Sequence, residues 1–214
     1  MAEQSFKYQP EIFNQGSYET AKKIVLTDEP GANHEQRWEQ ETAWLAALLN
    51  QALPKNDFLA LDFGCGVGRT SKILIEAGYT VLGVDISAEM RVHSAMQLSL
   101  KFSSVSPEVF DKLIDGGARF DLATSIWVLQ HCPNLELEVM RIFNALKPGG
   151  VLFVADMSHR AIPTDQGWVH DGKEVFPELI KCFELIQKIP YSYEGAAESL
   201  RQNAWLAFFR KPMV

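Results

Sequence analysis

The chain has 214 residues, a formal charge of −7 and 47% hydrophobic residues, which is typical of one globular domain with a sizeable core. The acidic balance disfavours a surface that grips nucleic acid by its phosphates, and no apolar run reaches membrane-spanning length. Cys65, Cys132 and Cys182 are scattered, as in proteins of a reducing compartment. The first residues lack the apolar centre of a signal peptide. We therefore expect a cytoplasmic monomer or homodimer that contacts neither nucleic acid nor membrane.

The order of the elements follows from periodicity and turn residues. Residues 1–33 are expected to form an irregular or partly helical arm, and apolar spacing predicts a helix over residues 34–53 that ends at Pro54. Residues 157–172 are expected to be a long loop, and residues 193–200 a helix or loop. Strands are predicted at 58–63, 80–84, 101–106, 120–126, 151–156, 183–189 and 204–210, and helices at 69–77, 87–99, 107–114, 134–146 and 173–182.

Alternation of strands and helices predicts an α/β fold, a doubly wound and mostly parallel seven-stranded sheet with helices on both faces. The last two predicted strands lie close together in the sequence, without a full crossover between them. We therefore expect the final strand to run antiparallel.

A glycine-rich turn in residues 59–70 dominates the middle of the chain. A buried strand ends near Asp62, glycines follow at Gly64, Gly66 and Gly68, and a helical pattern begins directly afterwards. Glycines allow close approach of the backbone to a ligand, and a helix N-terminus presents free N–H groups. This arrangement predicts nucleotide binding.

The spacing within the turn narrows the ligand. Asp85 ends the next predicted strand, where an acid accepts hydrogen bonds from ribose hydroxyls. In a dinucleotide-binding turn the third glycine would come one residue later, where this chain has Arg69. The turn therefore resembles an NAD-binding turn but does not match its glycine spacing. A helix-capping role for Asp85 beside Ser87 is the alternative.

Four separated segments carry a family resemblance. Residues 62–68 (DFGCGVG) resemble motif I of the class I S-adenosylmethionine-dependent methyltransferases, and residues 83–87 (GVDIS) resemble the end of that family's second strand. Residues 120–131 resemble its fourth strand with a "VLEH"-like continuation, and residues 146–152 resemble the turn before its fifth strand. The resemblance covers about residues 58–156 and implies the Rossmann-like methyltransferase fold with S-adenosyl-L-methionine as cofactor.

The resemblance also implies roles for individual residues. The backbone of residues 64–68 would follow the cofactor's amino acid and ribose, Asp62 would approach the amino-acid end, Asp85 would hold the ribose and Ile86 would cover the adenine. Ser106 stands near the position of an acid that often meets the adenine. The full set of expected cofactor-binding residues is Arg37, Asp62, Gly64, Cys65, Gly66, Gly68, Asp85, Ile86, Ser106, Ser125, Ile126 and Trp127.

Two of these residues have open alternatives. Arg37 either meets the cofactor's carboxylate from the N-terminal arm or is an ordinary solvated arginine on a helix. Trp127 stands where many members of the family carry a small or acidic residue, and it would border either the methionine end of the cofactor or the acceptor pocket.

His131 is the candidate general base, because it follows the carboxyl end of a predicted strand and its unperturbed pKa suits proton transfer. A structural role in the turn formed by residues 132–134 is the alternative. His159, His170 and Asp156 are rival bases. No pair of histidines has ligand spacing with cysteines or acids, so we expect no metal.

We expect a single methyltransferase domain over residues 1–214, with residues 1–53 as a cap or lid, 58–156 as the cofactor-binding core and 157–214 on the acceptor side. Trp168, Tyr191 and Tyr193 are candidates for lining an acceptor pocket, whereas Phe176 is better explained as core. The expected reaction is direct displacement of the methyl group by oxygen or nitrogen of a small-molecule acceptor. The alternatives are an NAD(P)-dependent oxidoreductase and a catalytically silent partner protein that binds S-adenosylmethionine.

Overall fold

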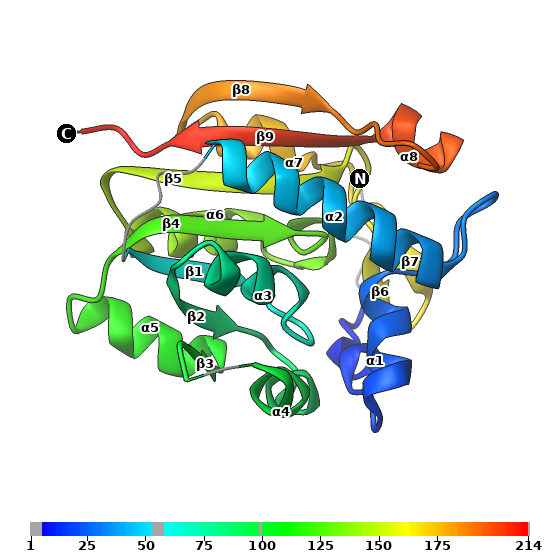
Figure 1. Cartoon of the computed structure of the whole chain (residues 1–214), viewed down its shortest axis with the longest axis horizontal. Coiled ribbons are helices and arrows are strands. Elements are labelled where there is room, and N and C mark those ends of the chain that lie inside the picture. Colours follow the sequence, from blue (N-terminus) through cyan, green and yellow to red (C-terminus); the bar gives the residue numbers. More distant parts are fainter. Residues whose placement is uncertain (1–5, 53–57, 99, 214) are drawn as a thin grey trace.

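A seven-stranded sheet forms the centre of the molecule in the computed structural model, which describes residues 6–52, 58–98 and 100–213 (Figure 1). The strand order is β3-β2-β1-β4-β5-β9-β8, and β9 is antiparallel to both neighbours while β1 to β5 pair in parallel. This arrangement confirms the predicted seven-stranded, mostly parallel sheet with an antiparallel final strand. The strands are β1 (Leu59–Phe63), β2 (Thr80–Val84), β3 (Phe102–Val105), β4 (Phe120–Ile126), β5 (Leu146–Met157), β8 (Glu184–Pro190) and β9 (Ala204–Arg210).

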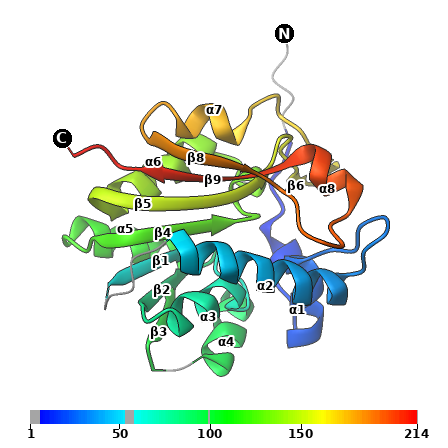
Figure 2. The ribbon, with the colours of Figure 1, turned by 45° about the horizontal axis from the view of Figure 1, so that its top comes forward.

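Helices cover both faces of this sheet (Figures 1 and 2). Buried side chains of α2 and α3 pack on one face, and those of α5, α6 and α7 pack on the other. No helix within the described ranges combines the length and the apolar character that a membrane crossing requires. The helices are α1 (Tyr18–Val25), α2 (His34–Ala52), α3 (Arg69–Glu76), α4 (Ala88–Gln97), α5 (Pro107–Asp115), α6 (Leu135–Ala145), α7 (Val175–Leu179) and α8 (Glu198–Asn203), with short 3-10 turns η1 (Pro10–Phe13) and η2 (Leu129–His131).

The two-sided core explains why the central strands read as nearly continuous apolar runs. In β5, Leu152 and Val154 face one helical layer while Phe153 and Ala155 face the other, and all four are fully buried. Successive side chains of a strand point to opposite faces. The sheet therefore holds the carboxyl ends of β1, β2 and β4 rigidly at one edge, where the candidate site lies.

Three expected boundaries are wrong. The helix expected at residues 173–182 is shorter and begins at Val175. In a helix that began at residue 173, Pro177 would be the fifth residue and would remove a backbone hydrogen bond. In α7 it is the third residue, whose N–H would have no partner within the helix. The expected loop over residues 157–172 contains a hairpin of β6 (Ile162–Thr164) and β7 (Gly167–Val169). Strand β5 begins at Leu146 rather than Val151. Leu146 pairs with Phe120 of β4, and a register shift separates this pair from the regular pairing that starts at Val151.

The N-terminal arm is more regular than expected. Ser17 caps α1 by accepting a hydrogen bond from the Thr20 N–H, and the helix buries Ala21. Of residues 193–200, expected to be helix or loop, only those from Glu198 onward are helical. The expected helix end at residues 53–54 and the expected boundary at Ser99 lie outside the described residues.

Candidate functional site

The glycine turn connects β1 to α3 and bends through left-handed backbone. Gly64, Gly66 and Gly68 have φ values of 76°, 51° and 88°, which glycine adopts without the steric cost that other residues incur. The Gly64 and Cys65 N–H groups donate to the carbonyl of Val84 at 2.7 and 3.0 Å. The turn is thereby tied to the end of β2, so that the two strand ends form one rigid edge.

Gly64 also has no room for a side chain, because a Cβ there would lie 2.2 Å from Cγ2 of Val128. We expect Gly64→Ala to displace Val128 from the site and to weaken cofactor binding at least tenfold, measured by calorimetry. Gly172→Ala is the matched control, since Gly172 has a similar φ of 80° but an added Cβ meets nothing within 4 Å. Equal effects of the two substitutions would attribute the loss to backbone strain alone.

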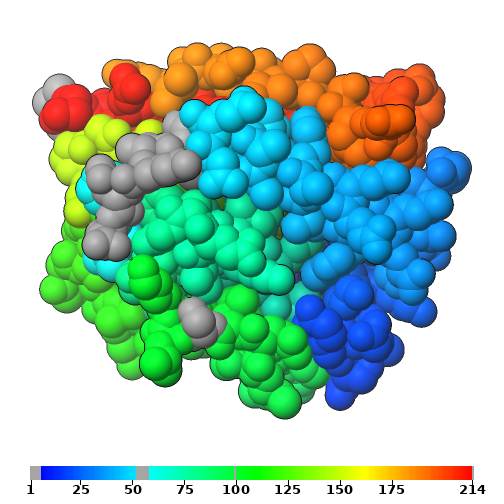
Figure 3. Space-filling view, in the orientation of Figure 1, coloured from blue at the N-terminus to red at the C-terminus, as the bar shows by residue number. Residues whose placement is uncertain are grey.

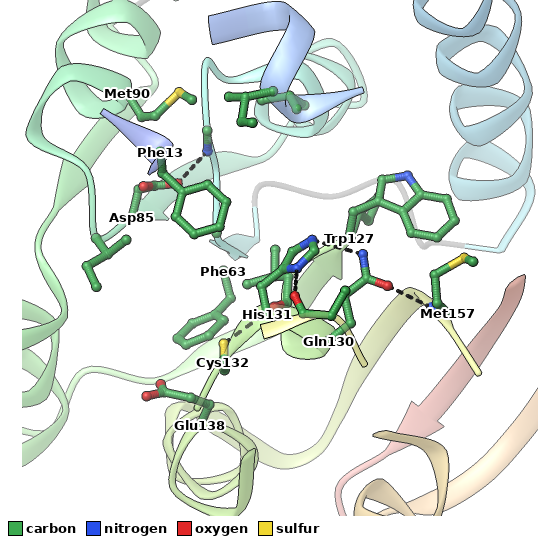
Figure 4. Close-up of a pocket in the computed structure, with 18 of the residues that line it drawn as sticks. Phe13, Phe63, Asp85, Met90, Trp127, Gln130, His131, Cys132, Glu138 and Met157 are labelled. Carbon is green, nitrogen blue, oxygen red and sulfur yellow. Dashed lines mark hydrogen bonds between the residues drawn. The ribbon is translucent and has the colours of Figure 1, made fainter. Parts of the chain in front are cut away.

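A cavity of about 480 Å³ opens at the carboxyl ends of β1, β2 and β4, the position at which α/β sheets bind ligands (Figure 4). Figure 4 shows Asp85 and Met90 on one side of the cavity and Trp127, Gln130 and Met157 on the other, with Phe13 and His131 between them. The cavity brings together eight of the expected cofactor-binding and catalytic residues, namely Arg37, Gly64, Gly66, Asp85, Ile86, Ile126, Trp127 and His131, and also Trp168, expected to line an acceptor pocket.

The other expected cofactor-binding residues do not line the cavity. The Asp62 carboxylate is buried and accepts hydrogen bonds from the hydroxyls of Ser71 (2.6 Å) and Thr124 (2.8 Å). Cys65 packs against Gly83 behind the turn, where its Sγ would lie 2.7 Å from an added Cβ. These contacts stabilise the turn from within the protein. Gly68 caps α3, Ser106 precedes α5 and Ser125 is buried in β4.

Asp85 is one of the acids that line the cavity. Its Oδ2 accepts the Gly66 N–H at 2.8 Å and its Oδ1 accepts the Ser87 N–H at 2.9 Å. Burial raises the pKa of Asp85 to about 6, against the lowering effect of these two backbone donors. One carboxylate therefore orients the glycine turn and the start of α4, with further acceptor capacity toward the cavity.

His131 is held in one tautomer. Its Nδ1 lies 2.6 Å from the carbonyl oxygen of Ala161, an atom that only accepts, so Nδ1 carries the proton. Its Nε2 is then the acceptor, 3.0 Å from the amide nitrogen of Gln130. The Gln130 amide is oriented in turn, because its Oε1 accepts the Met157 N–H at 3.3 Å. Burial lowers the pKa of His131, which keeps the ring neutral at neutral pH.

The N-terminal segment and the β6–β7 hairpin together border the cavity. Tyr8 forms a backbone bridge with Thr164, and the Asp165 N–H donates to the carbonyl of Lys7 at 3.0 Å. This pairing brings the rings of Phe13 and Trp168 to 5.9 and 5.3 Å from the His131 ring, centroid to centroid. The segment was expected to be a cap, but nothing in the sequence indicated that it pairs with the hairpin.

Helix α1 covers the glycine turn. Ala21 of α1, Val67 of the turn and Met90 of α4 form one buried cluster, and Val25 lies 3.1 Å from a Cβ added at Gly66. In the space-filling view the blue N-terminal segment packs against the green surface of the α4 region (Figure 3). The spacing of Tyr18, Ala21, Ile24 and Val25 is the amphipathic signal that could have identified this helix.

Arg37 is not a solvated helix residue, since it is only 4% exposed. Its Nη1 donates to the carbonyl of Thr27 at 2.6 Å and its Nη2 to Glu41 at 3.2 Å. Its buried Nε has no hydrogen-bond partner among the described residues. Arg37 also lines the cavity, where the positive charge of its guanidinium group would suit the carboxylate of a bound amino acid.

The rival bases lie elsewhere. His159 and His170 are exposed residues whose rings contact each other at 5.2 Å, and neither lines the cavity. Asp156 is buried and accepts the N–H groups of Gln130 and Met157, which places it behind His131. Within the described ranges, no three or more histidine, cysteine, aspartate or glutamate side chains gather as metal ligands would.

The chain resembles known methyltransferases in sequence and in fold. Residues 36–210 match the family model described as a methyltransferase domain. A ubiquinone biosynthesis O-methyltransferase of Brucella ovis is 30% identical over 179 residues, which cover 72% of this chain and 71% of that protein.

Solved structures share the fold at low sequence identity. The N-methyltransferase NodS from Bradyrhizobium japonicum WM9, in complex with S-adenosyl-L-homocysteine, has a TM-score of 0.63 and 17% identity and covers 92% of this chain and 100% of that one. An S-adenosylmethionine-dependent methyltransferase from Mesorhizobium loti has a TM-score of 0.61 and 19% identity and covers 79% and 98%.

Proposed function

The chain belongs to the class I S-adenosylmethionine-dependent methyltransferases, and we propose that it methylates oxygen or nitrogen of a small, flat and largely apolar acceptor. The family match sets aside the oxidoreductase alternative. The acceptor screen described below tests the alternative of a catalytically silent partner protein. Bound S-adenosylmethionine supplies a methyl group on a positively charged sulfur, and its transfer to a nucleophile needs no covalent enzyme intermediate.

The residues around the cavity fit this cofactor. Asp85 would accept the ribose hydroxyls, and Ile86, 49% exposed, would cover the adenine. The guanidinium group of Arg37 would meet the carboxylate of the methionine end. Ile126 and Trp127 would border the reacting centre. We assign Asp62, Cys65, Gly68 and Ser125 to shaping the turn and its strands from behind, because they do not line the cavity.

The acceptor chemistry is inferred from the part of the cavity around His131. The rings of Phe13 and Trp168 lie against His131 and Tyr8 also lines the cavity, and stacking on such rings favours a planar acceptor. Among the described lining residues are three acids, Glu29, Asp85 and Glu138, and one arginine, Arg37, while Arg141 pairs with Glu138 from outside the lining. An anionic acceptor would be repelled by these acids, so a neutral or cationic one is proposed.

His131 is proposed as the general base. Its Nδ1 proton is committed to Ala161, which leaves Nε2 as the atom that accepts a proton from the acceptor's hydroxyl or amine. To do so it exchanges the Gln130 hydrogen bond for one to the acceptor. Orientation of the nucleophile in the cavity contributes the rest, and good alignment is worth roughly 7–11 kcal/mol of barrier. The N-terminal segment and the hairpin would reduce the access of water to His131.

The single observation that carries the proposal is the continuous cavity with Asp85 at one side and His131 between two aromatic rings. The test is a screen of the purified protein with labelled S-adenosylmethionine against phenols, catechols, neutral aromatic amines and matched carboxylated analogues. We expect methylated product from the uncharged or cationic aromatic compounds. Activity confined to the carboxylated analogues, or to protein or RNA, contradicts the proposed acceptor class.

Trp168 provides a substitution that separates acceptor binding from cofactor binding. Its side chain is 50% exposed and lies over His131 from strand β7. We expect Trp168→Ala to raise KM for the acceptor about tenfold through loss of ring stacking and apolar contact, while the affinity for S-adenosylhomocysteine stays unchanged. Ile180→Ala is the control, since Ile180 is equally exposed and does not line the cavity. A fall in cofactor affinity in Trp168→Ala would place Trp168 on the cofactor side.

A further inference from the structure

Glu41 of α2 is fully buried and receives hydrogen bonds from four side chains. Its Oε1 accepts from Arg69 at 3.1 Å and from the Trp127 indole N–H at 2.8 Å. Its Oε2 accepts from Arg37 at 3.2 Å and from the Tyr191 hydroxyl at 2.5 Å. One carboxylate thus connects α2, the first residue of α3 and the segments that follow β4 and β8.

The charges make this carboxylate essential to the geometry around it. Two guanidinium groups, 5% and 4% exposed in their side chains, face the single carboxylate of Glu41. Burial acts to raise the pKa of Glu41, but Arg69 and Arg37 hold it below its ordinary value, so Glu41 is ionised. Removing its charge would leave two buried cations uncompensated, which breaks such an arrangement rather than merely weakening it.

Trp127 is held in an unfavourable backbone conformation. It is the only non-glycine residue with a positive φ (60°) in the described part of the chain, and such conformations persist only where the surroundings enforce them. The indole bond to Glu41 and the edge contact with the Tyr191 ring, 5.4 Å between centroids, supply that enforcement. The side chain is thereby fixed in the wall of the cavity.

We infer that Glu41 is a positioning residue for the cofactor: its carboxylate fixes the Trp127 indole and the Arg37 guanidinium together against the end of the cavity that takes the methionine moiety. Arg37 and Trp127 come from distant parts of the chain, and both donate a hydrogen bond to the carboxylate of Glu41. Glu41 itself does not line the cavity. The inference rests on the proposed cofactor site.

The test is calorimetric binding of S-adenosylhomocysteine to the wild type, Glu41→Gln, Trp127→Phe and the double variant, with thermal unfolding of each. We expect Glu41→Gln to weaken binding at least tenfold and Trp127→Phe about threefold. The double variant should bind like Glu41→Gln alone, because the indole has already lost its anchor. Effects that multiply, or a folded Glu41→Gln variant with wild-type affinity, overturn the inference.

Ile142→Val separates positioning from general loss of stability. Ile142 is fully buried in α6 on the opposite face of the sheet, so this variant lowers the unfolding temperature without touching the site. It should keep wild-type affinity, and an equal loss of affinity there overturns the inference. Should Glu41→Gln not fold, Tyr191→Phe removes a donor to the same carboxylate outside the cavity. We expect it to weaken binding about threefold, and unchanged affinity again overturns the inference. A wild type that binds no S-adenosylhomocysteine contradicts the cofactor site itself.

Discussion

His131→Ala is expected to lower kcat at least about a hundredfold, because general-base catalysis typically contributes 10²–10⁴, while the affinity for S-adenosylhomocysteine changes less than twofold. The expectation follows from the fixed tautomer: the Nδ1–H group donates to the Ala161 carbonyl oxygen, with 2.6 Å between nitrogen and oxygen, and the basic Nε2 therefore points toward Gln130. Turnover and calorimetry on the same preparation measure the two effects.

The pH dependence gives an independent readout of His131. Burial lowers its pKa below the ordinary 6.5, so the neutral ring that accepts a proton is the main form at neutral pH, and the rate falls only as the pH drops through the lowered pKa. This acidic limb should vanish in His131→Ala. His170→Ala is the control, as an exposed histidine outside the cavity. Undiminished turnover in His131→Ala with the natural acceptor would assign His131 a structural role in the turn after η2.

Asp85→Ala is expected to weaken S-adenosylmethionine binding at least tenfold, measured by calorimetry. The substitution removes the proposed ribose acceptor and also frees the N–H groups of Gly66 and Ser87, which donate to this carboxylate at 2.8 and 2.9 Å. Glu89→Ala is a matched control, because Glu89 carries the same charge at the start of α4 and does not line the cavity. Unchanged affinity in Asp85→Ala would exclude the ribose assignment.

Cofactor affinity should also depend on pH through Asp85. Burial raises its pKa to about 6 in the free protein, and protonation removes acceptor capacity that the ribose hydroxyls require. Binding therefore favours the carboxylate, so affinity is constant well above pH 6 and falls, by up to about tenfold per pH unit, below it. In Asp85→Ala this dependence should disappear, and a wild-type affinity that is flat from pH 7 to 5 would contradict it.

The sequence by itself determined the sheet, the glycine turn and the reaction class. These features are local: alternating strands and helices, three left-handed glycines at residues 64, 66 and 68, and an acid at the end of the next strand each leave a readable pattern. Parallel strands end at one edge of a sheet, so Asp85, Ile126 and His131 meet the turn by topology alone.

Only the tertiary structure decided which segments border the cavity and which groups fix the side chains in its walls. Glu41 lies 86 residues from Trp127 and 150 from Tyr191, and Tyr8 pairs with Thr164. The periodicity of the sequence does not predict such contacts, because they form when buried polar groups from separate elements need hydrogen-bond partners. The same requirement placed the oxygens of Asp62 on Ser71 and Thr124 rather than in the cavity. Short sequence patterns thus determined the cofactor class. Hydrogen bonds and ion pairs between distant buried residues decided the shape of the site proposed to receive the acceptor.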